Sequence, residues 1–222
     1  MTSSLLLFDL DGTLLETAPD LVGTLNTILV DEGLEPIELA TARNFIGQGA
    51  RAMIELGHST QSREVASERL DELFPVFLER YEARIAQETY AFPGLFDSME
   101  TLRSQGWALG VCTNKVEHLA RKLLGQLDML DWFTVITGGD TFDQHKPHPA
   151  HILETIKLAN ADPARSIMVG DSANDIDAAK AANVPVIAVD FGYTMTPVTE
   201  LGPDIVISHF SELEDAVGKL KN

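Results

Sequence analysis

Carboxylates follow two of the apolar runs in this sequence. Asp9 and Asp11 lie at the end of the first run, and Asp171 and Asp175 follow a later one. In an open parallel sheet, the loops at the carboxyl ends of the strands converge, so these four side chains are expected to meet at one edge. Crowded carboxylates repel one another unless a cation neutralises them, and a set of hard oxygen ligands selects Mg²⁺. The spacing therefore predicts a magnesium site.

A hydroxyl, an amide and a lysine are expected at the same edge. Thr113 and Asn114 follow another apolar run, and Lys146 precedes a helix-like segment. A hydroxyl and a lysine beside a metal can hold an anion, most naturally a phosphoryl group. A carboxylate can itself attack phosphorus and form an aspartyl phosphate, which water later hydrolyses. This set of residues predicts phosphoryl transfer, with one aspartate as nucleophile and the other as proton carrier.

The order of the elements indicates a mostly parallel α/β sheet, because short apolar runs alternate with helix-like segments. The six expected strands are residues 5–10, 107–112, 133–137, 166–170, 184–189 and 204–207. Residues 15–90 contain no strand-like run and are expected to form a helical insertion. The chain then divides into an α/β core, residues 1–14 and 91–222, and the inserted unit.

Two local patterns within the insertion indicate helices. Thr17 is expected to begin the first helix and to cap it with its hydroxyl. Apolar side chains between Leu70 and Tyr81 recur at helical spacing, and we expect them to face the core of the insertion rather than a ligand.

The composition is strongly acidic. The chain has 16 Lys and Arg against 34 Asp and Glu, a formal charge of −18, and its pI is about 4.5. Nucleic acid polymers and anionic membrane surfaces are excluded as partners, because both require clustered Lys and Arg. A single cysteine, Cys112, allows no internal disulfide, and the first apolar run lacks the features of a signal peptide. We expect a cytoplasmic protein that acts on a small phosphorylated metabolite, as a monomer or a homodimer.

The motifs resemble those of the haloacid dehalogenase superfamily of phosphatases. They are Phe8-Asp9-Leu10-Asp11-Gly12-Thr13-Leu14, Thr113-Asn114, Lys146-Pro147 and Gly170-Asp171-Ser172-Ala173-Asn174-Asp175. The resemblance covers nearly the whole chain and implies a Rossmann-like parallel sheet with a helical cap inserted after the first strand. Cys-Thr-Asn-Lys at 112–115, Gly-Gly-Asp-Thr at 138–141 and Lys-Pro-His-Pro at 146–149 are most similar to phosphoglycolate phosphatases. That similarity implies hydrolysis of 2-phosphoglycolate to glycolate and phosphate.

The resemblance also implies a role for each motif residue. Asp9 would be the nucleophile, and Asp11 would act first as general acid and then as general base. The implied phosphate ligands are Thr113, Asn114 and Lys146. Mg²⁺ would be held by the Asp9 side chain, the Asp11 backbone carbonyl and Asp171. Asp175 would support these ligands or bind the metal through water, and Ser172 with Asp175 forms a capping box for the next helix.

The insertion contains a glycine-bearing stretch at residues 43–49. Phosphoglycolate phosphatases have a similar arginine and Gly-x-Gly loop, and this resemblance implies that Arg43, or the amides near Gly47 and Gly49, receives the substrate carboxylate. A turn between two helices with a surface arginine explains the same pattern.

Several other functions remain open at this level. A different small phosphomonoester, such as a nucleotide or a sugar phosphate, would use the same residues, and a phosphosugar mutase would share all four motifs. A receiver-like phospho-switch also uses Asp, Thr and Lys with Mg²⁺, but such domains are about half as long and lack the insertion. His145, His148 and His151 are not expected to form a zinc site, because the intervening prolines prevent one regular helix from presenting them together.

Overall fold

The computed structural model describes residues 3–220, so the outermost ends of the predicted core, residues 1–2 and 221–222, lie outside the described residues. Its centre is a six-stranded parallel sheet with the order β5-β4-β1-β6-β7-β8. The strands are β1 (Ser3–Phe8), β4 (Trp107–Cys112), β5 (Val135–Thr137), β6 (Ala161–Gly170), β7 (Val186–Val189) and β8 (Ile205–Ile207). The predicted α/β class and all six predicted strands are confirmed.

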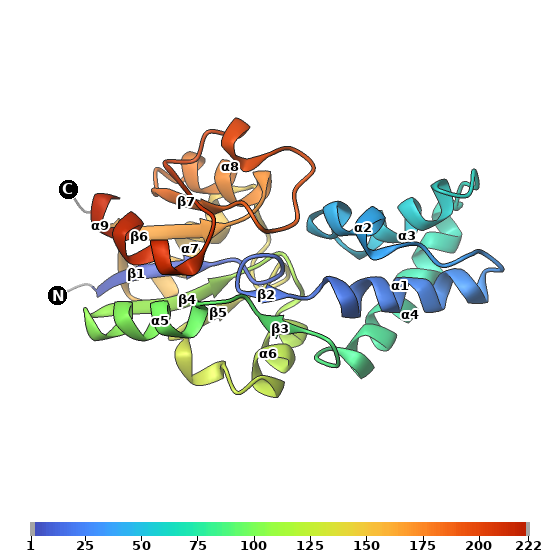
Figure 1. Ribbon diagram of the computed structural model, residues 1–222, viewed down its shortest axis with the longest axis horizontal. Helices are drawn as coiled ribbons and strands as arrows, with labels where there is room; N and C mark the ends of the chain where they lie inside the picture. Colours follow the sequence, from blue (N-terminus) through green and yellow to red (C-terminus); the bar gives the residue numbers. More distant parts are fainter. Residues whose placement is uncertain (1–2, 221–222) are drawn as a thin grey trace.

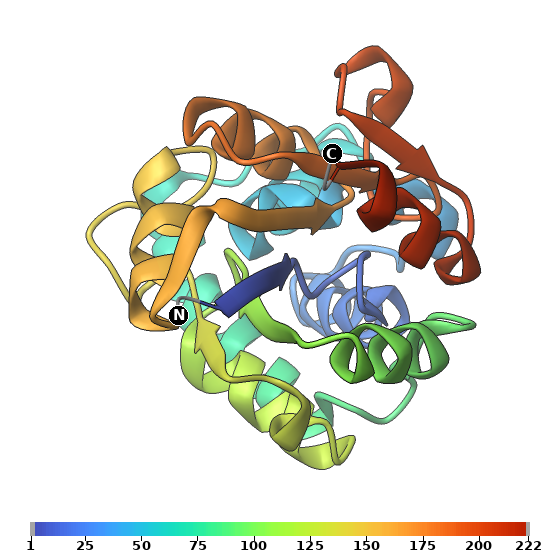
Figure 2. The same ribbon diagram turned by 90° about the vertical axis from the view of Figure 1, so that its left-hand side faces the viewer.

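Helices cover both faces of this sheet, which explains why the central parts of its strands are apolar. Helices α5 (Leu95–Ser104), α6 (Glu117–Gln126) and α9 (Leu213–Leu220) pack with Leu6 and Phe8 of β1. Helices α7 (Pro149–Leu158) and α8 (Ala173–Ala181) pack with Leu5 and Leu7. Figure 2 shows α7 and α8 on one side of the sheet and α5 and α9 on the other. Alternate residues of the central strand therefore supply the two layers of the core.

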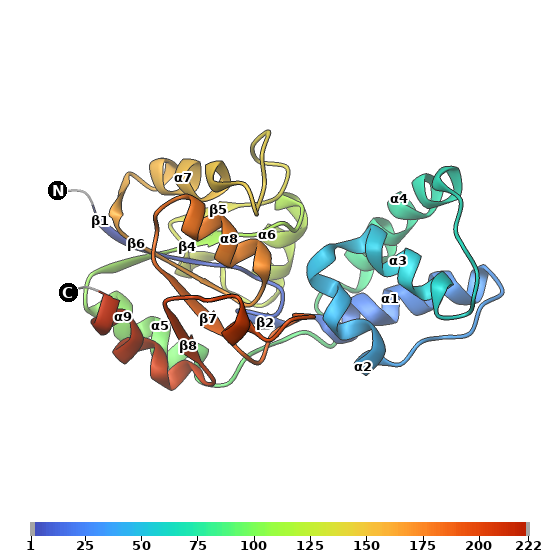
Figure 3. The same ribbon diagram turned by 90° about the horizontal axis from the view of Figure 1, so that it is seen from above.

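A separate group of helices lies beyond one end of the sheet (Figures 1 and 3). We call it the helical unit; its elements are α1 (Ala18–Asp31), α2 (Leu39–Ala42), the 3₁₀ helix η1 (Arg43–Gln48), α3 (Ala50–Ser59) and α4 (Ser67–Arg84). Figure 1 shows two strands at the junction with the sheet, β2 (Leu15–Glu16) and β3 (Tyr90–Ala91), which pair antiparallel. The expectation that residues 15–90 contain no strand was wrong here, because strands of two residues leave no periodic pattern.

The predicted first helix of the insertion begins where expected, but its cap is different. Helix α1 follows Thr17, whose hydroxyl is buried and has no hydrogen-bond partner among the described residues. The hydroxyl of Tyr193 instead accepts hydrogen bonds from the backbone N–H groups of Thr17 and Ala18, at 2.7 and 2.8 Å. The prediction of a capping threonine was therefore wrong, because a side chain from a distant loop occupies the capping position.

The apolar stripe of α4 is largely core, as predicted. Leu70, Leu73, Phe77 and Tyr81 are buried. The same helix also faces a cavity, described below, so the interpretation of the stripe as core alone was incomplete. Within residues 3–220, no helix combines the length and apolar character that crossing a bilayer requires.

Candidate active site

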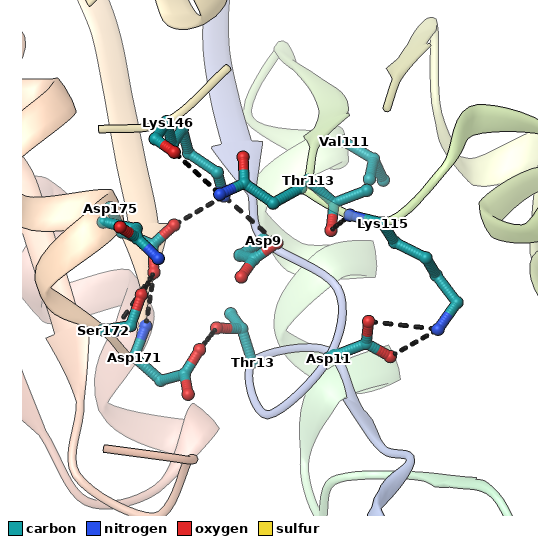
Figure 4. Close-up of polar contacts among 12 residues, drawn as sticks. Asp9, Asp11, Thr13, Val111, Thr113, Lys115, Lys146, Asp171, Ser172 and Asp175 are labelled. Atoms are coloured by element: carbon teal, nitrogen blue, oxygen red, sulfur yellow. Dashed lines mark hydrogen bonds and ion pairs between the residues drawn. The ribbon is translucent and has the colours of Figure 1, made fainter. Parts of the chain in front are cut away.

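The carboxyl ends of three neighbouring strands bring predicted site residues together (Figure 4). Asp9 follows β1, Thr113 follows β4 and Asp171 follows β6. The sheet order places β1 between β4 and β6, so these three residues start from adjacent positions. Lys146 lies in the loop between β5 and α7, and its side chain reaches the same place. The parallel sheet therefore gathers residues separated by more than a hundred positions in the sequence.

Three carboxylates form a compact group. Asp9, Asp171 and Asp175 each contribute one oxygen, and these oxygens all lie within 4.8 Å of one another. Asp171 and Asp175 are buried. Hydrogen bonds fix the orientation of Asp171, since the Thr13 hydroxyl donates to Oδ1 at 2.7 Å and the Tyr193 N–H donates to Oδ2 at 2.6 Å.

Lys146 places a buried positive charge within this group. Its Nζ lies 2.6 Å from Oδ1 of Asp175 and 3.1 Å from Oδ1 of Asp9. Burial alone would lower the pKa of Lys146, but the charges of Asp175 and Asp9 outweigh it and hold that pKa above its usual range. The lysine therefore stays protonated and can stabilise negative charge next to Asp9.

One lysine does not neutralise three carboxylates. Burial raises the pKa of Asp9 to about 6, although Lys146 opposes the shift. Burial also raises the pKa of Asp171 well above its usual range, with a further contribution from the charge of Asp175. Apart from its ion pair with Lys146, Oδ1 of Asp9 is buried and accepts no hydrogen bond from the described residues. Such hard, under-compensated oxygen donors fit a small divalent cation such as Mg²⁺.

The two motif residues after β4 have different surroundings. Thr113 is buried and lines the same cavity as Asp9. Asn114 also lines this cavity, and its side-chain Nδ2 donates to the backbone carbonyl of Lys146 at 2.7 Å. Asn114 thus fixes the loop that carries the buried lysine, a positioning contact that the motif alone does not reveal.

Asp11 is turned away from the carboxylate group (Figure 4). Both of its carboxylate oxygens accept hydrogen bonds from Lys115, at 3.0 and 3.1 Å. Nζ of Lys115 also donates to the hydroxyl of Tyr81 on α4, at 2.8 Å, and the lysine side chain is only 6% exposed. Sequence reasoning did not select Lys115 as a site residue, although it directly follows Thr113-Asn114 and lies within the motif at 112–115. A lysine is usually exposed, and only the structure shows that Lys115 is buried.

A cavity of about 430 Å³ separates the sheet edge from the helical unit. Asp9, Asp11 and Thr113 line it from the sheet. From the helical unit, apolar side chains line it together with Gly47, Gly49 and Arg51; the apolar residues are Leu21, Ile46, Met53, Phe74, Phe77 and Leu78. Both aspartates predicted for chemistry therefore face one compartment that is polar on the sheet side and apolar on the other.

The predicted residues of the helical unit divide into two groups. Gly47 and Gly49 line the cavity, whereas Arg43 is not among its lining residues. The Arg43 guanidinium forms an ion pair with Glu16 and donates to the backbone carbonyl of Phe191 at 2.9 Å. Arg51, which sequence reasoning did not select, lines the cavity and pairs with an exposed Asp71 at 2.7 Å.

The remaining predicted residues have structural contacts. The N–H and the hydroxyl of Ser172 both donate to Oδ2 of Asp175, at 3.1 and 2.6 Å, and the predicted capping box is present at the start of α8. His148 caps α7, whereas His151 is buried and accepts a hydrogen bond from the backbone N–H of Lys146 at 3.3 Å. Among the described residues, only the three aspartates form a cluster that could hold a metal.

Comparison with known proteins identifies the family. The sequence model of haloacid dehalogenase-like hydrolases matches residues 6–189. The chain belongs to the haloacid dehalogenase-like hydrolase family. Phosphoglycolate phosphatases from Mesorhizobium japonicum and Agrobacterium fabrum are 44% and 45% identical to this hydrolase. The alignments cover 96% and 97% of the chain and 94% and 92% of these relatives.

Solved structures of similar proteins agree with this assignment. The crystal structure of a predicted phosphoglycolate phosphatase from Haemophilus somnus has a TM-score of 0.89 and 27% identity, and the match covers 97% of this hydrolase and 98% of that chain. CbbY from Rhodobacter sphaeroides, solved in complex with xylulose-1,5-bisphosphate, has a TM-score of 0.77 at 24% identity, with coverage of 95% and 96%. At that identity the second likeness concerns the fold alone.

Proposed function

We propose that this hydrolase converts 2-phosphoglycolate to glycolate and phosphate through an aspartyl phosphate on Asp9, with Mg²⁺ as cofactor. The observation that carries the proposal is the shared cavity, which Asp9 and Asp11 line together while Lys146 holds a positive charge against Asp9. The similar proteins from Mesorhizobium and Agrobacterium are named phosphoglycolate phosphatases, which supports the choice of substrate.

The first half of the reaction forms the aspartyl phosphate. A carboxylate oxygen of Asp9 attacks phosphorus, and Asp11 gives a proton to the glycolate oxygen as the P–O bond breaks. Lys146, which pairs with Asp9, and Thr113, which lines the cavity, would stabilise the phosphoryl oxygens as their charge develops. In the second half, Asp11 takes a proton from water, and the water oxygen attacks phosphorus and releases Asp9.

Magnesium would be held by the Asp9 and Asp171 side chains and by the backbone carbonyl of Asp11, and it would supply positive charge to the phosphoryl group. Asp175 is fully occupied by Lys146 and Ser172, which supports a role in fixing the lysine and the loop. The apolar side of the cavity would keep bulk water from the aspartyl phosphate.

The contacts of the two arginines favour Arg51 over Arg43 as the group that meets the substrate carboxylate. Arg51 lines the cavity, and its acidic partner among the described residues, Asp71, is exposed. Arg43 is held by the buried Glu16 and by a backbone carbonyl outside the cavity lining. The loop between Gly47 and Gly49 lies beside Arg51 and can contribute backbone N–H groups.

We propose that residues 15–90 act as the cap of the site. We also propose that the protein is cytoplasmic, because a chain with one cysteine forms no internal disulfide that needs an oxidising environment. The cavity is large for a substrate as small as 2-phosphoglycolate, so the proposed substrate must be tested against other phosphomonoesters.

A panel of phosphomonoesters ranked by kcat/KM tests the proposed substrate. It contains 2-phosphoglycolate, nucleoside monophosphates and sugar phosphates. The expected result is a clear preference for 2-phosphoglycolate with release of free phosphate. A higher kcat/KM for a nucleotide or sugar phosphate would replace the substrate, and isomerised sugar phosphate without free phosphate would indicate a mutase.

A further inference from the structure

The loop after β7 connects the carboxylate group to the start of the helical unit. On one side, the backbone N–H of Tyr193 donates to Oδ2 of Asp171 at 2.6 Å. On the other side, the hydroxyl of the same residue donates to Oε1 of Glu16 at 2.5 Å. Tyr193 is almost completely buried. One residue thus joins an aspartate proposed to hold Mg²⁺ with the junction strand β2, which carries Glu16.

The Tyr193 hydroxyl also caps the first helix of the helical unit. It accepts hydrogen bonds from the N–H groups of Thr17 and Ala18, neither of which the Thr17 hydroxyl caps. The Ala18 N–H is shared with Oε1 of Glu16 at 3.3 Å, which itself accepts from the Tyr193 hydroxyl. Unpaired N–H groups at a buried helix start are costly, so the position of α1 depends on this hydroxyl.

Arg43 forms a second connection from the helical unit to the same loop. It pairs with Glu16 and donates to the carbonyl of Phe191, and its guanidinium lies 4.8 Å from the centre of the Tyr193 ring. The helical unit therefore contacts the loop both at the start of α1 and through η1.

Close packing leaves this loop little room to move independently of Asp171. A Cβ added at Gly12 would lie 2.6 Å from Oδ2 of Asp171 and 2.8 Å from the Tyr193 ring. A Cβ added at Gly192 would lie 2.2 Å from Cβ of Asp171. A shift of Tyr193 toward or away from the helical unit would therefore disturb the hydrogen bond that orients Asp171.

We propose that Tyr193 is a positioning residue that couples the orientation of Asp171, and hence Mg²⁺ binding, to the seating of the helical unit on the core. This proposal rests on the proposed magnesium dependence. Because coupling between two sites is reciprocal, Mg²⁺ binding stabilises the seated position of α1, and loosening α1 weakens Mg²⁺ binding.

The substitution Tyr193→Phe tests the coupling, because it removes the hydroxyl and keeps both the ring and the backbone N–H. Mg²⁺ affinity is measured by calorimetric titration without substrate, and backbone hydrogen exchange is followed over residues 17–21 and 43–47 with and without Mg²⁺. In the wild type, we expect Mg²⁺ to slow exchange in both segments. In Tyr193→Phe, we expect Mg²⁺ to bind about 2- to 12-fold more weakly, the range for one hydrogen bond, and no longer to protect residues 17–21.

Two further variants complete the test. Tyr90→Phe is the control, because Tyr90 is an exposed tyrosine of the junction strand β3, and it should behave as the wild type. Arg43→Met, also measured without substrate, should reduce the Mg²⁺-dependent protection of residues 43–47 even if Tyr193→Phe folds poorly.

The two proposals fail in distinguishable ways. Mg²⁺ affinity and protection unchanged in both Tyr193→Phe and Arg43→Met would overturn the coupling and leave the magnesium site intact. Absence of Mg²⁺ binding by the wild type would overturn the magnesium site and, with it, the coupling.

Discussion

Lys115 holds the proposed acid and base of the reaction, and the substitution Lys115→Met removes its charge while keeping much of its length. The lysine donates to both oxygens of Asp11 and is 6% exposed. A buried hydrogen bond to a charged group contributes about 1.5–3 kcal/mol. If the transition state loses that much stabilisation because Asp11 is no longer held in place, phosphorylation of the enzyme by 2-phosphoglycolate slows roughly 10- to 150-fold.

The assay compares single-turnover rates on two substrates. Glycolate is a poor leaving group that needs a proton from Asp11, whereas 4-nitrophenolate departs without one. Lys115→Met should therefore slow phosphorylation by 2-phosphoglycolate far more than phosphorylation by 4-nitrophenyl phosphate. The matched control is Lys122→Met, because Lys122 also joins the core to α4, through an exposed ion pair with Glu82 at 3.0 Å. Two results would refute the role of Lys115. One is an equal loss of rate on both substrates in Lys115→Met. The other is a rate within about twofold of the wild type, which is what the loss of an exposed ion pair would produce.

Three further predictions concern the metal, the helical unit and the substrate. Chelation of Mg²⁺ should abolish activity. Carboxylates must lose their protons to bind the metal, and burial raises the pKa of Asp9 to about 6 and that of Asp171 above its usual range, so Mg²⁺ affinity by titration should be at least about tenfold weaker at pH 5 than at pH 7. A pH-independent affinity would contradict this assignment. Asp20 is buried in α1 and accepts two backbone N–H groups and a hydroxyl from the returning chain, so Asp20→Asn should lower the free energy of unfolding by about 1.5–3 kcal/mol. The control is Asp31→Asn, at an exposed aspartate, which should lower the free energy of unfolding by less than about 1 kcal/mol. Equal losses of unfolding free energy in the two variants, measured by denaturant titration, would contradict the role of Asp20. Arg51→Ala should raise KM for 2-phosphoglycolate more than Arg43→Ala does. The reverse order would indicate that Arg43, and not Arg51, binds the substrate carboxylate.

The parts of the fold that follow from local patterns could be read from the sequence. The six core strands are apolar because both faces of the sheet are covered, and such runs are visible in one dimension. The Ser172–Asp175 capping box lies within four residues and was equally visible. The convergence of Asp9 and Asp171 follows from the rule that parallel strands end at the same edge.

Contacts between distant segments could not be read in this way. The hydroxyl that caps α1 belongs to Tyr193, which is 176 residues away from Thr17. Lys115 is adjacent to the motif residues, but its burial depends on Tyr81 of the helical unit. Arg43 could bind a substrate carboxylate, but its guanidinium is already paired with the carboxylate of Glu16. In each case a partner from another part of the chain decides what the side chain does.

In the proposed mechanism, Asp9 carries the phosphoryl group during turnover. Acid quenching during steady-state hydrolysis of 2-phosphoglycolate, followed by peptide mass spectrometry, tests it directly. We expect one phosphoryl group on the peptide that contains Asp9. It should be lost on treatment with hydroxylamine and be absent from Asp9→Asn, which should not turn over. A phosphoryl group on another residue, or sustained turnover by Asp9→Asn, would show that Asp9 is not the nucleophile.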